Sequence, residues 1–367
     1  NWTHTGYAQQ IRFGSGVIDE TARAVQTLGC TRVLLVTTEG RRRSAAGERL
    51  IRGLGAMLVS VFDKVRSHVP TTLIDQALEQ LRRDGADCIV SFGGGSCSDL
   101  GKAVCYFLAG DTAIARASFF DQPALPHVSI PTAYSGAELT AFFGMTDLAA
   151  RRKSGAGGAT IAPAVVLYDP QVTLDLPVRV SAETAMNALA HCVESAWSPS
   201  RTPEAEAIAL TGAARIGRWL PIVAEHPADL AARSELLVGA MLGGRCLQNA
   251  SMGVHHGLAQ LTGGRTGIAH GLANALILAH AVRFNADAVP EVIAALAVAL
   301  GRRDGDAARA IDELRQRVGL PAGLAACGVT QDDLAEIARL SANNMNIAKN
   351  PKPVSVADAR AILEAAY

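Results

Sequence analysis

The stretch ADCIVSFGGGSCSDLGKAV, residues 86–104, decides the fold of the first half of this chain. An apolar run of strand-forming residues leads into three glycines, Gly93 to Gly95, and a helical pattern begins at Ser96. Glycine lets the backbone approach a ligand closely, and a helix N-terminus attracts a phosphate through its N–H groups and its dipole. The pattern therefore predicts a phosphate-binding turn at the carboxyl end of a strand. The alternative is a tight turn in which the glycines serve packing alone.

Apolar strands and amphipathic helices alternate on both sides of this turn. Strands are predicted at 31–38, 56–63 and 126–132, and an amphipathic helix is predicted at 71–85. Repeated β-α-β units form a parallel sheet with right-handed crossovers. The fold class expected for the first half is therefore a Rossmann-like α/β domain with a nucleotide-binding sheet.

The second half of the chain has a different pattern, with long helical periodicities rich in alanine and leucine. Two prolines mark the transition at 168–177. We therefore expect an α/β dinucleotide-binding domain at 1–177, followed by an all-α domain at 178–367 that carries the histidines described below.

Composition excludes several classes of function. Lys and Arg number 34, as do Asp and Glu, and this zero net charge gives no reason to expect nucleic acid or an anionic membrane as a partner. No apolar run reaches the roughly 18–20 residues that span a bilayer. The seven cysteines form no CxxC motif and lie mostly in apolar stretches, which is typical of reduced thiols in a cytoplasmic protein.

Three histidines and one amide in the second half have the spacing of a shared site. Asn187 and His191 are one helical turn apart, so both side chains lie on one face. His256 lies on a second predicted helix, and His270 follows a glycine-rich turn. With an aspartate at 187 these residues would predict a divalent metal site, whereas the neutral amide predicts weak metal affinity or none. The alternative is a set of core histidines held by hydrogen bonds.

Several motifs, in this order along the chain, resemble the iron-type (group III) alcohol dehydrogenase superfamily. They are FGSGVI (13–18), GGGSCSDLGKAV (93–104), PTAYSGAELT (131–140), MNALAHCVES (186–195), HHGLAQLTGG (255–264) and AHGLANALILAH (269–280). The resemblance covers nearly the whole chain. It implies the dehydroquinate synthase-like fold of that superfamily, and hydride transfer at a carbonyl compound with NADH or NADPH as cofactor.

The resemblance also implies roles for single residues. Thr38 falls where many members carry an aspartate that binds the adenosine ribose. Three arginines at 41–43 follow and could either bind a 2′-phosphate or form a solvated charge cluster, so NADH and NADPH both stay open. The residues implied around the cofactor are Thr38, Gly93, Gly94, Gly95, Ser96, Asp99, Thr132, Tyr134, Ser135 and Lys153. The ligands implied for a divalent metal, Fe or Zn, are Asn187, His191, His256 and His270.

Within the superfamily, the chain resembles the maleylacetate reductase branch most closely. That branch also has an asparagine and three histidines at the ligand positions, a double histidine like His255-His256, and a C-terminal stretch like NPKP (350–353). This implies a small unsaturated or keto acid as hydride acceptor, with no metal required. Arg265 is the best candidate to hold the anionic substrate, with Lys153 and Lys352 as further candidates. The catalytic residues implied are His191, His255, His256, His270 and Arg265.

Two other functions stay open. AHGLANA (269–275) resembles the metal-dependent members, so an Fe- or Zn-dependent alcohol or polyol dehydrogenase is one alternative. A non-redox lyase or cyclase that keeps the nucleotide-binding fold, as in the related dehydroquinate synthases, is the other. By family resemblance we also expect the chain to form a homodimer.

Overall fold

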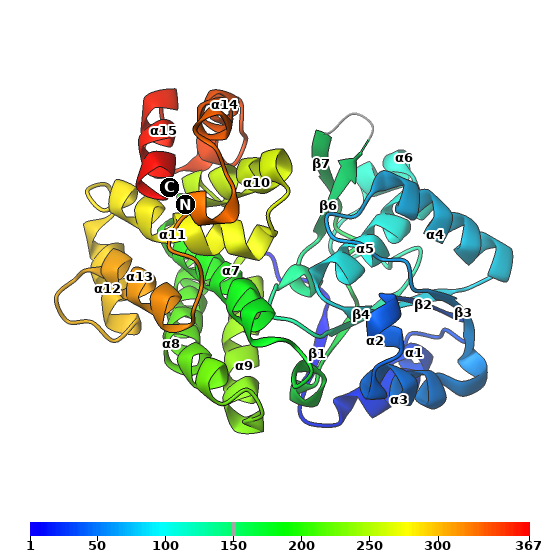
Figure 1. Ribbon diagram of the computed structural model, residues 1–367. Helices are drawn as coiled ribbons and strands as arrows, with labels where there is room; N and C mark the ends of the chain where they lie inside the picture. The colour runs from blue at the N-terminus through cyan, green and yellow to red at the C-terminus, as the bar shows by residue number, and fades with distance from the viewer. Residues whose placement is uncertain (149–151) are drawn as a thin grey trace. The chain divides into compact units, whose positions relative to one another are not determined.

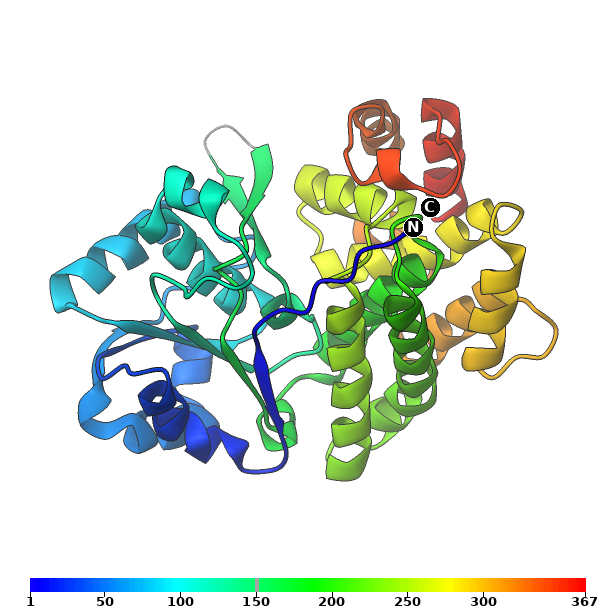
Figure 2. The same cartoon turned by 180° about the vertical axis from the view of Figure 1, so that it is seen from behind.

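The computed structural model describes residues 1–148 and 152–367, and for residues 152 and 153 the backbone alone. The chain forms two compact units (Figure 1). Residues Thr5–Leu176 make up a sheet unit, and Pro177–Tyr367 together with Asn1–His4 make up a helical unit. A 3.1 Å hydrogen bond between His4 Nδ1 and Thr202 Oγ1 ties the N-terminal segment to the helical unit. Both chain ends therefore lie in this unit (Figure 2).

The sheet unit contains a six-stranded parallel sheet, which confirms the predicted Rossmann-like architecture. The strand order is β1-β8-β5-β4-β2-β3, and every neighbouring pair is parallel. The strands are β1 (Gln10–Phe13), β2 (Val33–Thr37), β3 (Leu58–Phe62), β4 (Cys88–Gly93), β5 (His127–Pro131) and β8 (Val165–Tyr168). The strands β2, β4 and β5 are buried along their whole length, as expected where helices cover both faces.

Helices cover both faces of the sheet because successive side chains in a strand point to opposite sides. In β2, Leu34 and Val36 pack in one core with residues of α4 and α5, whereas Val33 and Leu35 pack in the other with residues of α1 and α3. The helices of this unit are α1 (Thr21–Thr27), α2 (Glu39–Arg42), α3 (Ala45–Leu54), α4 (Thr71–Asp84), α5 (Gly95–Ala109) and α6 (Asp111–Arg116). The two cores hold the carboxyl ends of the strands in a fixed row.

An antiparallel hairpin of β6 (Phe142–Asp147) and β7 (Arg152–Gly157) packs against α5 in the same unit. The sequence pattern does not predict this hairpin, because Gly144 and Gly155 interrupt the run and glycine has low strand propensity. The structure explains one of these glycines. A Cβ on Gly155 would lie 2.9 Å from the carbonyl oxygen of Phe143 on the facing strand, so a larger residue would disturb the pairing.

The helical unit is built around α7 (Val178–Trp197), whose residues from Ser181 to Trp197 are buried apart from Thr184. The segment contains no glycine and no proline, so a helix is its expected local structure. Helix α7 packs against α8, α9 and α11 (Figure 1). The remaining helices are α8 (Pro203–Glu225), α9 (Leu230–Cys246), α10 (Val254–Thr266), α11 (His270–Asn285), α12 (Pro290–Ala299), α13 (Ala307–Arg317), α14 (Gln331–Ser341) and α15 (Val356–Ala365). None of the described helices is apolar over a length that would cross a membrane.

Close packing on α7 depends on glycines in the facing helices. A Cβ on Gly243 of α9 would lie 2.7 Å from the carbonyl oxygen of Ala188. A Cβ on Gly271 of α11 would lie 2.6 Å from the carbonyl oxygen of Glu183. Any larger residue would therefore push the helices apart. The close packing of α11 on α7 at Gly271 also fixes the position of His270, the first residue of α11 and one of the predicted site residues.

Candidate active site

The glycine turn lies at the carboxyl end of β4, and α5 begins at Gly95, one residue earlier than the sequence pattern predicts. A Cβ on Gly93 would lie 2.3 Å from Cys97 Sγ, and a Cβ on Gly95 would lie 2.8 Å from Ser135 Oγ. Glycine is therefore required at both positions for packing. The N-cap of α5 is Gly94, and within the described part of the chain no side-chain hydrogen bond caps this end of the helix. The first N–H groups of α5 can therefore meet an anionic ligand, apart from Cys97 N, which donates to Gly94 O at 2.9 Å.

A pocket of about 500 Å³ opens at this turn in the sheet unit. Its lining includes Thr38, Gly94, Gly95 and Ser96, four of the residues predicted at the cofactor. Thr38 follows β2, the neighbour of β4 in the sheet, and its hydroxyl accepts a 3.2 Å hydrogen bond from Arg41 N. The volume is that of a ligand site, and the position is the one where α/β sheets bind nucleotides.

Other residues predicted at the cofactor support the turn. Thr132 and Tyr134 are buried, and Thr132 N donates a 2.9 Å hydrogen bond to Gly93 O. Ser135 packs against Gly95. Lys153 lies in β7, and its side chain is outside the part of the chain that the structure describes.

Asp99, predicted near the pyrophosphate, has a buried cationic partner. Lys102 Nζ lies 2.8 Å from Asp99 Oδ1, and it also donates to Ala137 O at 2.7 Å and to Thr140 Oγ1 at 2.8 Å. The Lys102 side chain is fully buried, where an ammonium group needs such partners. Lys102 therefore joins α5 to the segment that follows Ser135 and holds this side of the site in place.

Four histidines gather in the helical unit. His191 of α7 and His256 of α10 stack with ring centroids 4.8 Å apart, His255 meets His256 edge-on at 5.0 Å, and His270 lies 6.0 Å from His256. Three of the rings are buried, and His270 is half-buried. Asn187 is buried one turn before His191 in α7. The structure thus brings the predicted histidines together, and their catalytic roles stay predictions.

Glu194 is a functional candidate that the sequence patterns did not single out. Its carboxylate is fully buried and accepts four hydrogen bonds. Oε1 accepts from Gly253 N and His255 N, both at 3.0 Å, and Oε2 accepts from His256 N at 3.1 Å and His256 Nδ1 at 2.6 Å. Its signal in the sequence is the spacing from His191, three residues earlier in the same helix.

The charge of Glu194 follows from these contacts. Burial by itself raises the pKa of this carboxyl, but hydrogen bonds from His255 and His256, together with their charge, outweigh burial and hold the pKa well below its usual range. Glu194 is therefore ionised in the folded protein. His191 differs, because burial and then the charge of His256 lower its pKa well below the ordinary value of 6.5, so this ring is neutral.

The hydrogen bonds also fix the tautomers of two rings. His255 Nε2 lies 3.0 Å from Asn274 O, and a carbonyl can only accept, so this nitrogen carries a proton. His256 Nδ1 lies 2.6 Å from the ionised Glu194 carboxylate, so it carries a proton as well. In the neutral ring Nε2 of His256 is then the atom that can hold a ligand or accept a proton, and in the imidazolium form it can deliver that proton.

The side chains predicted to bind a metal are three imidazoles and one amide, all neutral when they ligate. Among the described residues, one group of acidic, cysteine and histidine side chains has ligand atoms within 4.8 Å of one another, namely Glu194, His255 and His256. A cation there would displace hydrogen bonds that already occupy both oxygens of Glu194. The Nδ1 atom of His191 is buried and has no hydrogen-bond partner among the described atoms, so a bound ligand could satisfy it.

Similarity to known proteins identifies the family of this chain. The family model for iron-containing alcohol dehydrogenase matches residues 8–170, and that for the C-terminal part of the Fe-containing alcohol dehydrogenase family matches residues 181–367. The maleylacetate reductase of Burkholderia cepacia is 35% identical over 358 residues, which cover 98% of this chain and 95% of that protein. This chain belongs to the iron-containing alcohol dehydrogenase family.

Solved structures agree with this assignment. The maleylacetate reductase of Rhizobium sp. strain MTP-10005 has a TM-score of 0.88 at 34% identity, covering 100% of this chain and 98% of that one. Sulfoacetaldehyde reductase from Bifidobacterium kashiwanohense, solved in complex with NAD+, has a TM-score of 0.90 at 25% identity, also covering 100% and 98%. The predicted family and fold class are confirmed, and this member of the iron-containing alcohol dehydrogenase family is an NAD(P)-dependent oxidoreductase.

Two cations predicted at the substrate are engaged in ion pairs in this family member. Arg265 lies in the last turn of α10 instead of the turn after it, and its Nε lies 2.9 Å from Asp333 Oδ1. Lys352 Nζ lies 2.5 Å from Asp287 Oδ1 and 4.2 Å from the centre of the Phe284 ring. Each would have to leave its carboxylate partner to bind a substrate, so the structure gives neither residue new support.

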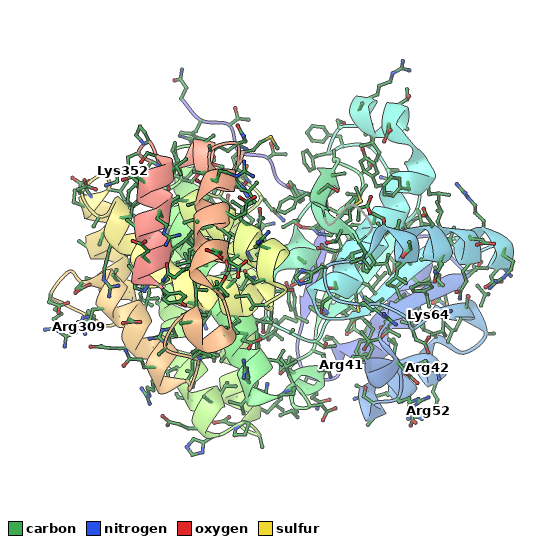
Figure 3. The ribbon with its side chains drawn as sticks, turned by 45° about the horizontal axis from the view of Figure 1, so that its top comes forward. Arg41, Arg42, Arg52, Lys64, Arg309 and Lys352 are labelled. Atoms are coloured by element: carbon green, nitrogen blue, oxygen red, sulfur yellow. The ribbon has the colours of Figure 1, made fainter. Side chains whose placement is uncertain are left out.

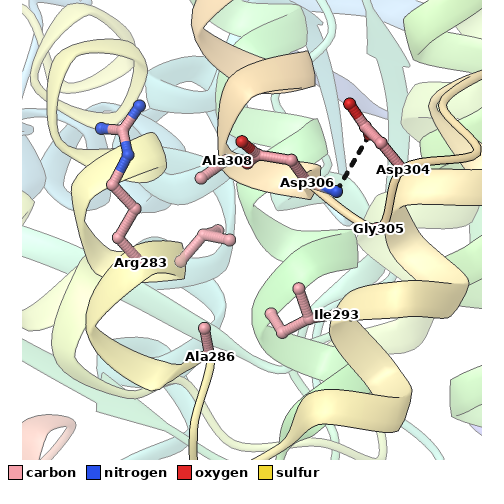
Figure 4. Close-up of a pocket in the computed structure, with 8 residues that line it drawn as sticks. Arg283, Ala286, Ile293, Asp304, Gly305, Asp306 and Ala308 are labelled. Carbon is pink, nitrogen blue, oxygen red and sulfur yellow. Dashed lines mark hydrogen bonds between the residues drawn. The ribbon is translucent and has the colours of Figure 1, made fainter.

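The helical unit has a second pocket, of about 240 Å³, lined by residues of α11, α12 and α13 and of the segments that follow α11 and precede α13 (Figure 4). Its carboxylates serve local structure. Asp306 caps α13 by accepting from Arg309 N at 2.8 Å, and Asp304 accepts from Asp306 N at 3.2 Å. None of the residues given for this lining belongs to the histidine cluster, so the pocket is separate from the candidate active site.

Proposed function

We propose that this chain is a metal-independent, NAD(P)H-dependent reductase of the maleylacetate type. The observation that carries the proposal is the pair of Glu194 and His256, stacked against neutral His191, with the uncharged Asn187 where a metal-binding carboxylate would stand. An imidazolium supported by a carboxylate can supply the positive charge that a metal ion would otherwise provide, and it can also supply a proton. Relatives at 35% and 34% identity that are maleylacetate reductases support the substrate class.

The chemistry assigned to the side chains follows from this pair. NAD(P)H, when bound, supplies the hydride. In a maleylacetate-like substrate the hydride adds to the alkene carbon β to the keto group, the electron pair moves onto the keto oxygen, and a proton on the adjacent carbon completes a saturated 3-oxo diacid. His256 in its imidazolium form, which the Glu194 carboxylate stabilises, stabilises the negative oxygen through Nε2–H and then provides that proton, leaving a neutral ring.

The first test is a pair of variants assayed for consumption of NADPH and of NADH with maleylacetate. His256→Ala should lower turnover at least about 100-fold with an unchanged circular dichroism spectrum, because both the proton and the oxyanion stabilisation are lost. His226→Ala is the control, since His226 is exposed and lies outside the cluster. Near-normal turnover of His256→Ala would refute the role of His256, and consumption of neither NADPH nor NADH by the wild-type protein would favour a lyase or cyclase.

One observation favours a second candidate, a metal-dependent alcohol dehydrogenase. The buried Nδ1 of His191 has no hydrogen-bond partner among the described atoms, which fits a metal ligand as well as a substrate contact. Metal analysis of the purified protein and chelator treatment separate the two functions. We expect activity with maleylacetate to survive chelation. Stoichiometric Fe or Zn, with activity lost on chelation and restored by the metal, would replace our proposal with the metal-dependent one.

We also propose that the chain works in the cytoplasm as a homodimer. Support for the compartment comes from the thiols, because six of the seven free cysteines are buried and none is in a disulfide within the described residues. Sedimentation equilibrium at micromolar concentration tests the oligomeric state, and a mass of one chain would contradict the dimer.

A further inference from the structure

The pocket of the sheet unit contains two lining residues that no sequence motif indicates, Arg66 and Ser67. They follow β3, the strand at the edge of the sheet next to β2. Thr38, which follows β2, lines the same pocket, and so do the residues of the glycine turn that follows β4. Three adjacent strand ends therefore contribute to one pocket, in the order turn, Thr38, Arg66.

The order of these strand ends determines which residues would lie near each part of a bound dinucleotide. A pyrophosphate at the N-terminus of α5 directs the adenosine ribose toward the end of the neighbouring strand, where α/β folds recognise the 2′ position. In this chain the neighbouring strand ends in Thr38, which has no carboxylate to repel a 2′-phosphate. The next side chain along the row of strand ends is the guanidinium of Arg66.

The segment that carries Arg66 is held against Thr38 by its backbone. Thr38 and Lys64 form an isolated β-bridge, and Val65 N donates a 3.3 Å hydrogen bond to Thr37 O. The chain then turns through two left-handed residues, His68 with φ 64° and Val69 with φ 43°. A β-branched residue rarely adopts this conformation, and backbone strain of this kind clusters at ligand sites.

Ion pairing distinguishes Arg66 from two of the nearby arginines. Arg42 Nε lies 3.1 Å from Asp63 Oδ2, and Arg43 Nη2 lies 2.6 Å from Glu39 Oε1, so both have carboxylate partners. Figure 3 shows Arg41, Arg42 and Lys64 on the same part of the sheet unit. Among the ion pairs between described residues none includes Arg41 or Arg66, but Arg66 is exposed and lines the pocket, whereas Arg41 is not among the residues given for the lining. Because Arg42 and Arg43 already have carboxylate partners, Arg41 is the one residue of the three arginines at 41–43 that still fits the predicted 2′-phosphate site.

We propose that Arg66, together with Thr38 and Ser67, binds the 2′-phosphate of NADPH and makes this chain an NADPH-using enzyme. The proposal rests on the proposed function, because it requires a dinucleotide at the glycine turn. A guanidinium forms paired, charge-assisted hydrogen bonds with a phosphate monoester, and the two hydroxyls supply neutral donors beside it. NADH lacks this phosphate, so Arg66 contributes little to its binding.

The test measures binding of NADPH and NADH to the full chain by isothermal titration calorimetry, without a substrate. We expect wild-type protein to bind NADPH at least as tightly as NADH. In Arg66→Gln the Kd for NADPH should rise at least about 10-fold, while the Kd for NADH changes less than about 2-fold. Adenosine 2′-monophosphate should compete with NADPH on the wild-type protein and lose this ability in the variant.

Two further variants sharpen the test. Lys64→Gln removes one positive charge from the same segment at a residue outside the given lining, and it should leave the NADPH to NADH ratio within about 2-fold of the wild type. Thr38→Asp should weaken the binding of NADPH more than the binding of NADH, because the added carboxylate would repel the 2′-phosphate that only NADPH carries. Equal weakening of both nucleotides in Arg66→Gln, or NADH binding without NADPH binding in the wild type, would overturn the role of Arg66. Binding of neither nucleotide would overturn the cofactor site itself, and the role of Arg66 with it.

Discussion

At the scale of single residues, the contact between Glu194 and His256 is central to the proposed chemistry. Two backbone N–H groups from residues 253 and 255 anchor one oxygen of Glu194, which leaves the other oxygen directed at the backbone and the ring of His256. A carboxylate that orients an imidazole raises its basicity and selects its tautomer. Replacing Glu194 should therefore affect the reaction through His256.

Glu194→Gln should lower kcat about 10–100-fold while KM for NADPH and for maleylacetate stays within about 3-fold, because the ring is still present and loses its orientation. The pH profile of kcat should change as well, which a purely structural role would not produce. Glu225→Gln, a change at an exposed residue paired with Arg317, is the matched control. A fall in thermal stability with unchanged kcat would contradict the positioning role.

A second prediction at the scale of single residues concerns the reactivity of the Cys97 thiol. Cys97 lies beside the glycine turn, and burial raises its pKa to about 12. At pH 8 the thiolate fraction is then on the order of 10⁻⁴, so the thiol should be inert to alkylation. Mass spectrometry after iodoacetamide treatment of the native protein should find label on the partly exposed Cys327 before Cys97. Early labelling of Cys97 would show that the turn opens.

At the scale of elements, glycines decide how closely helices approach α7. Gly243→Ala should lower the free energy of unfolding by about 1–3 kcal/mol, because the new Cβ would lie 2.7 Å from the carbonyl oxygen of Ala188. Gly264→Ala in α10 is the matched control, since nothing lies within 4 Å of its Cβ position, and it should be neutral or stabilising by up to about 1 kcal/mol. Chemical denaturation measures both variants. Equal changes in the free energy of unfolding for the two variants would mean that helix propensity, and not packing against α7, decides the effect of Gly243→Ala.

At the scale of the whole molecule, buried neutral histidines make folding stability depend on pH. His127 is fully buried in β5 with its Nε2 2.8 Å from Ser91 Oγ, and burial, followed by the charge of Lys102, lowers its pKa to about 3. The unfolded chain binds a proton at this ring below pH 6.5, whereas the folded chain does not. The free energy of unfolding should therefore fall as the pH drops, by about 1.4 kcal/mol per unit between pH 6 and pH 4 from this residue.

His127→Gln isolates this contribution, because the other titrating groups are common to both proteins. We expect a lower stability at pH 7 from the altered packing against Gly101, and a slope of stability against pH that is shallower by up to about 1.4 kcal/mol per unit. Parallel slopes for the two proteins, measured by urea denaturation, would show that His127 titrates normally.

The sequence by itself determined the features that depend on local pattern. Strand alternation, the glycine turn before α5 and the alanine-rich helices follow from near-neighbour sterics and periodicity, and they predicted the parallel sheet and the helical half of the chain. The spacing of Asn187 and His191 on one helix face is local in the same sense.

Only the tertiary structure decided the contacts between distant segments. Glu194 meets His256 across 62 residues, Arg66 reaches the pocket of the glycine turn from another strand end, and Arg265 pairs with Asp333. Such contacts depend on how whole helices and strands pack, which no local pattern encodes. For the same reason Gly155 of β7 makes sense only beside Phe143 on the strand that it faces.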